Sequence, residues 1–190
     1  MPIQVHCKTQ TCSFHLKNHL AKRTLNIKWD GKTLKRTPFP VYLGVTLDRT
    51  LSFGEHVSKL RKKLASRNNL VTNLANTKWG ASPETLRLTS LALCYSTAEY
   101  SAAAWSRSSH ANKVNTELNK CCRTITGTMK ATPLQDLYVL SGIAPPDIRR
   151  ETCSMIERQK QLTDARHAKT CSGGDSPITQ GVNAGWKHKL

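Results

Sequence analysis

The spacing of apolar residues changes near Ser52, and this change constrains the fold of the 190-residue chain more than any other feature. Residues 3–47 alternate between polar and apolar types and are interrupted by turn-forming residues, as in short β-strands. After Ser52 the apolar residues recur three or four positions apart, as on one face of a helix. The sequence therefore predicts an α+β fold, mainly α, in which a small N-terminal head containing a β-hairpin precedes a helical bundle.

The head carries two strand signals. An Asp-Gly dipeptide joins residues 24–29 to residues 32–34, and Asp-Gly between alternating runs is typical of a tight β-hairpin. Residues 41–47 follow two prolines and are rich in β-branched and aromatic side chains, so we expect a third strand there.

The first helix is expected to begin at Ser52, because Ser52 and Glu55 have the spacing of a capping box. Its buried face should hold Val57, Leu60, Leu64, Val71 and Leu74. Further helices are predicted to start near Ser82, His110, Thr132 and Pro146. The second of the five should run to about Trp105 and be the most buried, since it is apolar on most sides. Gly127 and Gly142 should end the third and fourth helices.

Charge limits the choice of partner. The chain has 29 Lys and Arg against 12 Asp and Glu, a formal net charge of +17. Such a surface attracts polyanions, of which nucleic acid is the most common. Binding to an anionic membrane surface is less favoured, because aromatic residues make up only 6% of the chain. A membrane-spanning helix is not expected either, since no apolar stretch approaches roughly 20 residues. We therefore expect a nucleic-acid partner and no membrane.

The cysteines and the start of the chain indicate where the protein resides. The seven cysteines are scattered, and no apolar signal sequence follows Met1. Both features predict an intracellular, reduced protein in which cysteines act as small buried apolar residues.

Residues that could support autonomous catalysis are sparse. No two acidic residues are adjacent in the sequence, whereas polymerases and many nucleases need paired carboxylates for metal ions. Cys7, Cys12, His15 and His19 are of the types that zinc favours, but their spacing is too tight for a finger, so a strand-like segment is preferred and no metal site is predicted. Glu99 is a lone carboxylate, which is more often hydrogen-bonded than catalytic.

Basic residues gather on the first predicted helix, opposite its apolar face. Along this helix, and just beyond it, several cations and one aromatic ring could contact phosphates and bases: Lys59, Arg61, Lys62, Lys63, Arg67, Lys78 and Trp79. The alternative is an ordinary solvated helix face, with Trp79 plugging the bundle.

Six stretches resemble, in order, the end of the polymerase domain of jockey-like non-LTR retrotransposons. They are Lys8-Thr9-Gln10, Tyr42-Leu43-Gly44 within residues 41–48, Asn76-Thr77-Lys78-Trp79-Gly80, Ala98-Glu99-Tyr100 through Trp105, Arg123-Thr124-Ile125-Thr126-Gly127 with the following Thr132-Pro133, and Gly142-Ile143-Ala144-Pro145-Pro146. Leu51, Ser52, Phe53 and His56 also follow the strand as the family pattern expects. The resemblance covers about residues 6–160.

This resemblance implies a palm remnant with a primer-grip-like strand in residues 1–50, a thumb-like bundle in residues 51–166 and a disordered tail in residues 167–190. Lys8 would match the lysine that protonates pyrophosphate as a general acid, although Val5-His6-Cys7 replaces the usual Asn-Pro before it. Tyr42, Leu43 and Gly44 would form the primer grip. The implied partner is an RNA–DNA or DNA duplex, bound without sequence preference, in the nucleus.

The family's catalytic aspartates lie upstream of the matching segment. We therefore expect a truncated RNA-directed DNA polymerase that has no cofactor of its own and cannot extend a primer alone; Mg²⁺ is implied only for the full-length enzyme. Two alternatives are a domesticated nucleic-acid-binding protein and an inert helical interaction module. The oligomeric state is left open.

Overall fold

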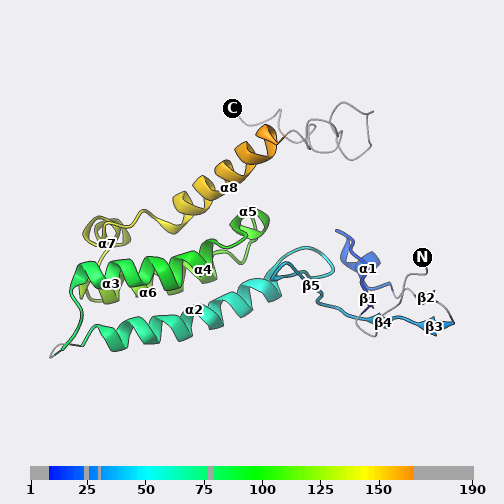
Figure 1. The fold of residues 1–190 in the computed structure, drawn as a ribbon, viewed down its shortest axis with the longest axis horizontal. Coiled ribbons are helices and arrows are strands. Elements are labelled where there is room, and N and C mark those ends of the chain that lie inside the picture. Colours follow the sequence, from blue (N-terminus) through cyan, green and yellow to red (C-terminus); the bar gives the residue numbers. More distant parts are fainter. Residues whose placement is uncertain (1–8, 24–25, 30, 77–78, 165–190) are drawn as a thin grey trace. The chain divides into compact units, whose positions relative to one another are not determined.

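The computed structural model describes residues 9–23, 26–29, 31–76 and 79–164 (Figure 1). The described residues divide into two units, one that ends at Glu151 and one that begins at Thr152. The described residues are mainly helical with a few two-residue strands, which confirms a mainly helical α+β class. Lys8, Asp30, Lys78 and the predicted tail from residue 167 lie outside the described residues.

The head contains short strands and one helical turn. Strands β2 (Lys28–Trp29) and β3 (Lys32–Thr33) pair antiparallel, which confirms the hairpin predicted from Asp-Gly. Strand β1 (Gln10–Thr11) pairs with β4 (Lys35–Arg36) in parallel, a contact that sequence periodicity did not predict. Helix α1 (Asn18–Ala21) follows β1 and precedes β2 along the chain.

Residues 41–47 form a second hairpin, and the single strand predicted there is wrong. Strand β5 (Val41–Tyr42) pairs antiparallel with β6 (Val45–Thr46). Leu43 and Gly44 both have positive φ, 45° and 79°, which is the conformation of the tight turns that join two antiparallel strands. The sequence did not predict this turn, because leucine is not a typical turn residue and its β-branched and apolar neighbours suggest a continuous strand.

Helix α2 (Gly54–Leu74) begins two residues later than expected, and the Ser52–Glu55 capping box is not formed. The carboxylate of Asp48 caps the segment instead. It accepts hydrogen bonds from the backbone N–H of Ser52 at 2.6 Å and of Gly54 at 3.3 Å, and from the Ser52 hydroxyl. The Ser52 hydroxyl donates to Asp48, and the N-cap position is taken by Phe53, whose side chain makes no capping bond. Asp48 thereby ties the second hairpin to the start of α2.

The second predicted helix is interrupted rather than continuous to Trp105. It consists of α3 (Pro83–Ser90), a π-helical turn η1 (Leu91–Tyr95), α4 (Ser96–Glu99) and α5 (Ala102–Trp105). Its start is confirmed, since the Ser82 hydroxyl accepts from the Thr85 N–H at 3.3 Å. The break follows Tyr100, whose carbonyl accepts from the Trp105 indole at 3.2 Å.

Three more helices complete the described chain: α6 (Asn112–Thr126), α7 (Leu134–Ser141) and α8 (Pro146–Thr163). Gly127 and Gly142 follow α6 and α7 with φ of 67° and 61°, which confirms both predicted helix ends.

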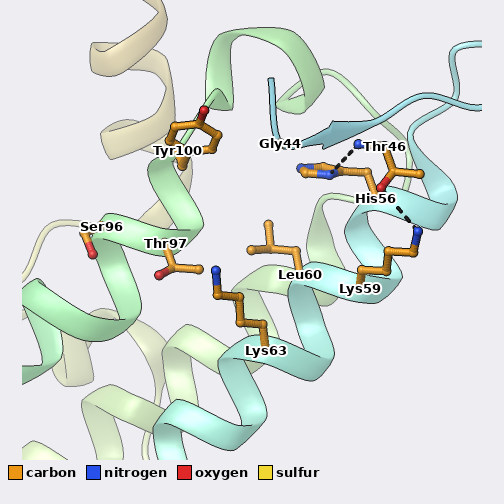
Figure 2. A pocket seen from close by; sticks show the side chains of 9 residues that line it. All are labelled: Gly44, Thr46, His56, Lys59, Leu60, Lys63, Ser96, Thr97 and Tyr100. Atoms are coloured by element: carbon orange, nitrogen blue, oxygen red, sulfur yellow. Dashed lines mark hydrogen bonds between the residues drawn. The ribbon is translucent and has the colours of Figure 1, made fainter. Parts of the chain in front are cut away.

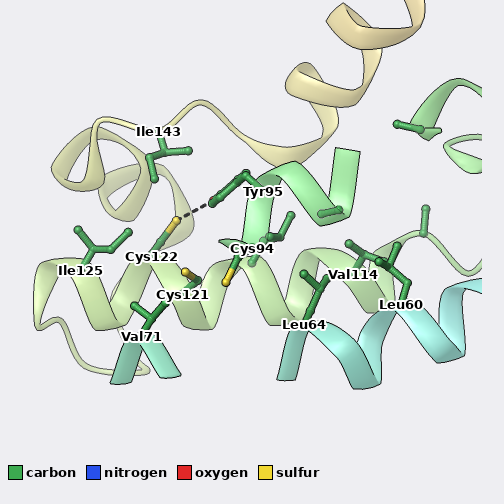
Figure 3. Close-up of a cluster of buried hydrophobic side chains, with 14 of the residues drawn as sticks. Leu60, Leu64, Val71, Cys94, Tyr95, Val114, Cys121, Cys122, Ile125 and Ile143 are labelled. Carbon is green, nitrogen blue, oxygen red and sulfur yellow. Dashed lines mark hydrogen bonds between the residues drawn. The ribbon is translucent and has the colours of Figure 1, made fainter. Parts of the chain in front are cut away.

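The core lies between α2, the interrupted helix, α6 and α7 (Figure 3). The predicted apolar face of α2 is confirmed at Val57, Leu60, Leu64 and Val71, whereas Leu74 is exposed. Three cysteines behave as buried apolar residues, as expected: Cys94, Cys121 and Cys122. Trp105 is fully buried at the end of this core near the second hairpin.

Candidate nucleic-acid interface

The second hairpin presents the three residues of the predicted primer grip. Tyr42 and Leu43 are 68% and 72% exposed. The Tyr100 hydroxyl donates to the Leu43 carbonyl at 2.9 Å, which holds the turn against the interrupted helix. A Cβ at Gly44 would lie 3.3 Å from the Tyr100 ring, so glycine permits both the positive φ and this close contact.

A cleft of about 380 Å³ lies between this hairpin, α2 and α4 (Figure 2). It brings together residues that the sequence placed in two separate motifs, since Gly44 comes from the predicted primer grip and two lysines come from the basic cluster. Its lining consists of Gly44, Thr46, His56, Lys59, Leu60, Lys63, Ser96, Thr97 and Tyr100. Leu60 forms the apolar floor and also belongs to the core.

The lysines of α2 remain available to a ligand. The Lys59 ammonium donates to the Thr46 hydroxyl at 3.4 Å and lies 3.9 Å from a Glu55 carboxylate oxygen, and its side chain is still half exposed. Lys62 and Lys63 are exposed and form no hydrogen bond or ion pair within the described residues. These three cations could contact phosphates without breaking a strong internal bond.

The two arginines of the same cluster are engaged within the protein. Arg61 donates to Glu117 of α6 at 3.2 Å, and the Glu117 side chain is only 3% exposed. Arg67 donates to the Leu93 carbonyl and to the Thr97 hydroxyl, beside the π-helical turn. Both guanidinium groups therefore join α2 to neighbouring helices, and we assign them to packing rather than to a ligand surface.

The remaining predicted residues lie apart from the cleft or outside the described chain. Trp79 is 68% exposed, so it does not plug the bundle. Lys78 and Lys8 lie outside the described residues. Glu99 forms two hydrogen bonds with the Arg149 guanidinium, one of them at 3.1 Å, which confirms that it is a paired carboxylate.

His56 is one of six cleft residues that pattern analysis did not assign to the site; the others are Thr46, Leu60, Ser96, Thr97 and Tyr100. Its Nδ1 accepts from the Thr46 N–H at 3.3 Å, and its ring lies 6.2 Å from that of Trp105. Burial lowers the pKa of His56, and the nearby charge of Lys59 lowers it further. The residue matched the family pattern, but a single histidine near a helix start gives no signal of its role.

Across residues 9–164, apart from the gaps noted above, no three His, Cys, Asp or Glu side chains are grouped to hold a metal ion. Cys7 of the zinc alternative lies outside this part. None of the described helices combines the length and apolarity needed to cross a bilayer.

Comparison with protein-family models, with curated proteins and with solved structures finds no match for this chain.

Proposed function

We propose that this chain binds the phosphate backbone of a nucleic-acid duplex, as the primer-grip and thumb part of a jockey-like reverse transcriptase. The observation that carries this proposal is the cleft, because its walls join the Gly44 turn to Lys59 and Lys63. In a primer grip and thumb, a hairpin and a basic helix must face the same duplex. The positions of the Gly44 turn and of the α2 lysines in the sequence do not by themselves predict that they line one cleft.

The electrostatics of the surface support the same function. The exposed cations of α2 that are not paired with Glu117 are lysines, which bind phosphates as point charges. The net charge of +17 extends this attraction beyond the cleft. Contacts of this type carry no sequence information, so the binding should be non-specific and should weaken steeply with salt.

A salt titration tests the proposal. Fluorescence anisotropy with a DNA duplex and an RNA–DNA hybrid would compare the wild type with Lys59→Gln/Lys62→Gln/Lys63→Gln. If each lysine neutralises one phosphate, the slope of log K against log salt should fall in magnitude by about 2.7. Glutamine keeps much of the side-chain length and removes only the charge.

A matched control uses three exposed lysines of the head, in Lys28→Gln/Lys32→Gln/Lys35→Gln. This variant should keep most of the wild-type slope. Equal losses in the two variants would mean that charge is spread over the whole surface and that α2 has no privileged role. If the chain does not bind duplex even at low salt, the proposed function is wrong, and the alternative of an inert helical interaction module is favoured.

A further inference from the structure

The tautomer of His56 follows from its hydrogen bond to the second hairpin. Because Nδ1 accepts the Thr46 N–H, Nδ1 carries no proton, and the neutral ring must carry its proton on Nε2. Nε2 is therefore a hydrogen-bond donor. It is buried and has no partner among the described residues. His56 as a whole is 8% exposed and lines the cleft.

An unpartnered buried donor destabilises the folded chain, because it has lost its hydrogen bonds to water. The rest of the cleft indicates which partner is missing. Its lining offers two ammonium groups, from Lys59 and Lys63, and the hydroxyl of Thr46. The hydroxyls of Ser96, Thr97 and Tyr100 already donate to backbone carbonyls. None of its nine lining residues is a carboxylate. A group with several negatively charged oxygens would satisfy the donor and both cations together.

We propose that the cleft is a phosphate subsite, in which neutral His56 donates from Nε2 to a phosphate oxygen while Lys59 and Lys63 neutralise the charge. This inference rests on the proposed function, because the phosphate belongs to the backbone of the bound nucleic acid. It adds a neutral donor to the cationic surface. Such a donor fixes the position of one phosphate, whereas lysines alone attract phosphates from many directions.

The neutral state of His56 is maintained by its surroundings. Protonation at Nδ1 would remove the bond from the Thr46 N–H, and the charges that face the ring in the described cleft are those of Lys59 and Lys63. Facing groups from other elements are uncharged: Thr46 of β6, Tyr100, and Trp105 of α5. Phosphate binding through His56 should therefore be constant between pH 7 and 8.5, where a protonated histidine would not persist.

Two substitutions separate a ligand-binding role from a structural one. In His56→Asn the amide oxygen can still accept the Thr46 N–H, but the donor at the Nε2 position is lost. In His56→Gln a donor can still reach the Nε2 position, while the Thr46 bond is lost. We expect His56→Asn to weaken duplex binding roughly tenfold and His56→Gln to retain most of the affinity. The opposite order would make His56 a structural residue and overturn the proposal.

Nitrogen-15 NMR of the histidines in the wild-type chain gives a test that needs no substitution. Titration with the duplex, and separately with inorganic phosphate, should shift the Nε2 resonance of His56. Full duplex affinity without this shift would overturn the subsite and leave the proposed function intact. A shift with inorganic phosphate in a chain that binds no duplex would support the subsite and overturn the proposed function.

Discussion

The two faces of α2 differ in how completely the fold satisfies their polar groups. On the face toward α6, the Asn68 amide donates to the Glu117 carbonyl at 2.8 Å and accepts from the Cys94 thiol at 3.3 Å, and Arg61 pairs with the Glu117 carboxylate. On the face toward the cleft, Lys63 has no partner in the described residues and His56 keeps an unused donor. The first face stabilises the bundle, whereas the polar groups of the second face remain available to a ligand.

Backbone conformation shows the same contrast. In the described chain, the non-glycine residues with positive φ are Leu43, Leu51, Phe53 and Ser101. They lie in the hairpin turn, in the segment that starts α2 and next to Tyr100, all close in sequence to residues that line the cleft. Residues in this region of φ cost free energy and persist where surrounding structure holds them, which is a common feature of functional sites. Strain therefore gathers on the cleft side of the molecule.

The largest effect is expected on the satisfied face. Arg61→Glu would place a second carboxylate beside the buried Glu117, which would keep only Lys120 as a cationic partner. Because Arg61 itself is half exposed, the free energy of unfolding should fall by about 2 kcal/mol. Urea unfolding followed by circular dichroism measures this. Lys62→Glu, one position further on an exposed site, is the matched control and should change stability by less than about 0.5 kcal/mol. Equal effects would remove the distinction between the two faces.

The hairpin turn should tolerate little change at its glycine. Gly44→Ala introduces a Cβ at φ of 79° and 3.3 Å from the Tyr100 ring. We expect a loss of about 1–2 kcal/mol in unfolding free energy, together with weaker duplex binding as the turn shifts. Gly31→Ala, at φ of 71° in open space, is the control for backbone strain alone. If both variants lose the same stability, contact with Tyr100 contributes nothing.

Protonation of His56 should make the cleft side sensitive to acid. Its pKa is lowered in the folded chain from the ordinary value of 6.5, so the unfolded chain binds the proton more readily. Unfolding free energy should therefore decrease as pH falls below 6.5, by at most about 1.4 kcal/mol per pH unit from this group. His56→Asn lacks this contribution. The wild type should therefore lose more unfolding free energy than His56→Asn between pH 7 and pH 5.5. Equal losses in the two proteins would contradict the prediction.

The smallest effect concerns Leu43, an exposed leucine with positive φ. Asparagine adopts this conformation more readily, so Leu43→Asn should raise the unfolding free energy by about 0.5 kcal/mol. If the leucine side chain contacts the duplex, affinity should fall in the same variant. A gain in stability with unchanged affinity would restrict the interface to the lysines and the cleft.

The sequence alone determined the features that depend on neighbours along the chain. Ser82 and Pro83 mark a helix start, and Gly127 and Gly142 mark helix ends, because capping bonds and left-handed turns involve residues a few positions apart. The buried face of α2 could be predicted from helical spacing at Val57 to Val71, since periodicity fixes which side chains share a face.

Only the tertiary structure decided what the charged and polar residues of α2 do. Arg61 and Lys62 are adjacent cations in the sequence, and the difference between them depends on Glu117, which lies on another helix. The capping of α2 by Asp48, the break after Tyr100 and the cleft beside His56 likewise depend on hydrogen bonds that local pattern does not encode. A polar side chain bonds to whichever partner folding brings within reach, and that partner is set by packing rather than by its neighbours in the chain.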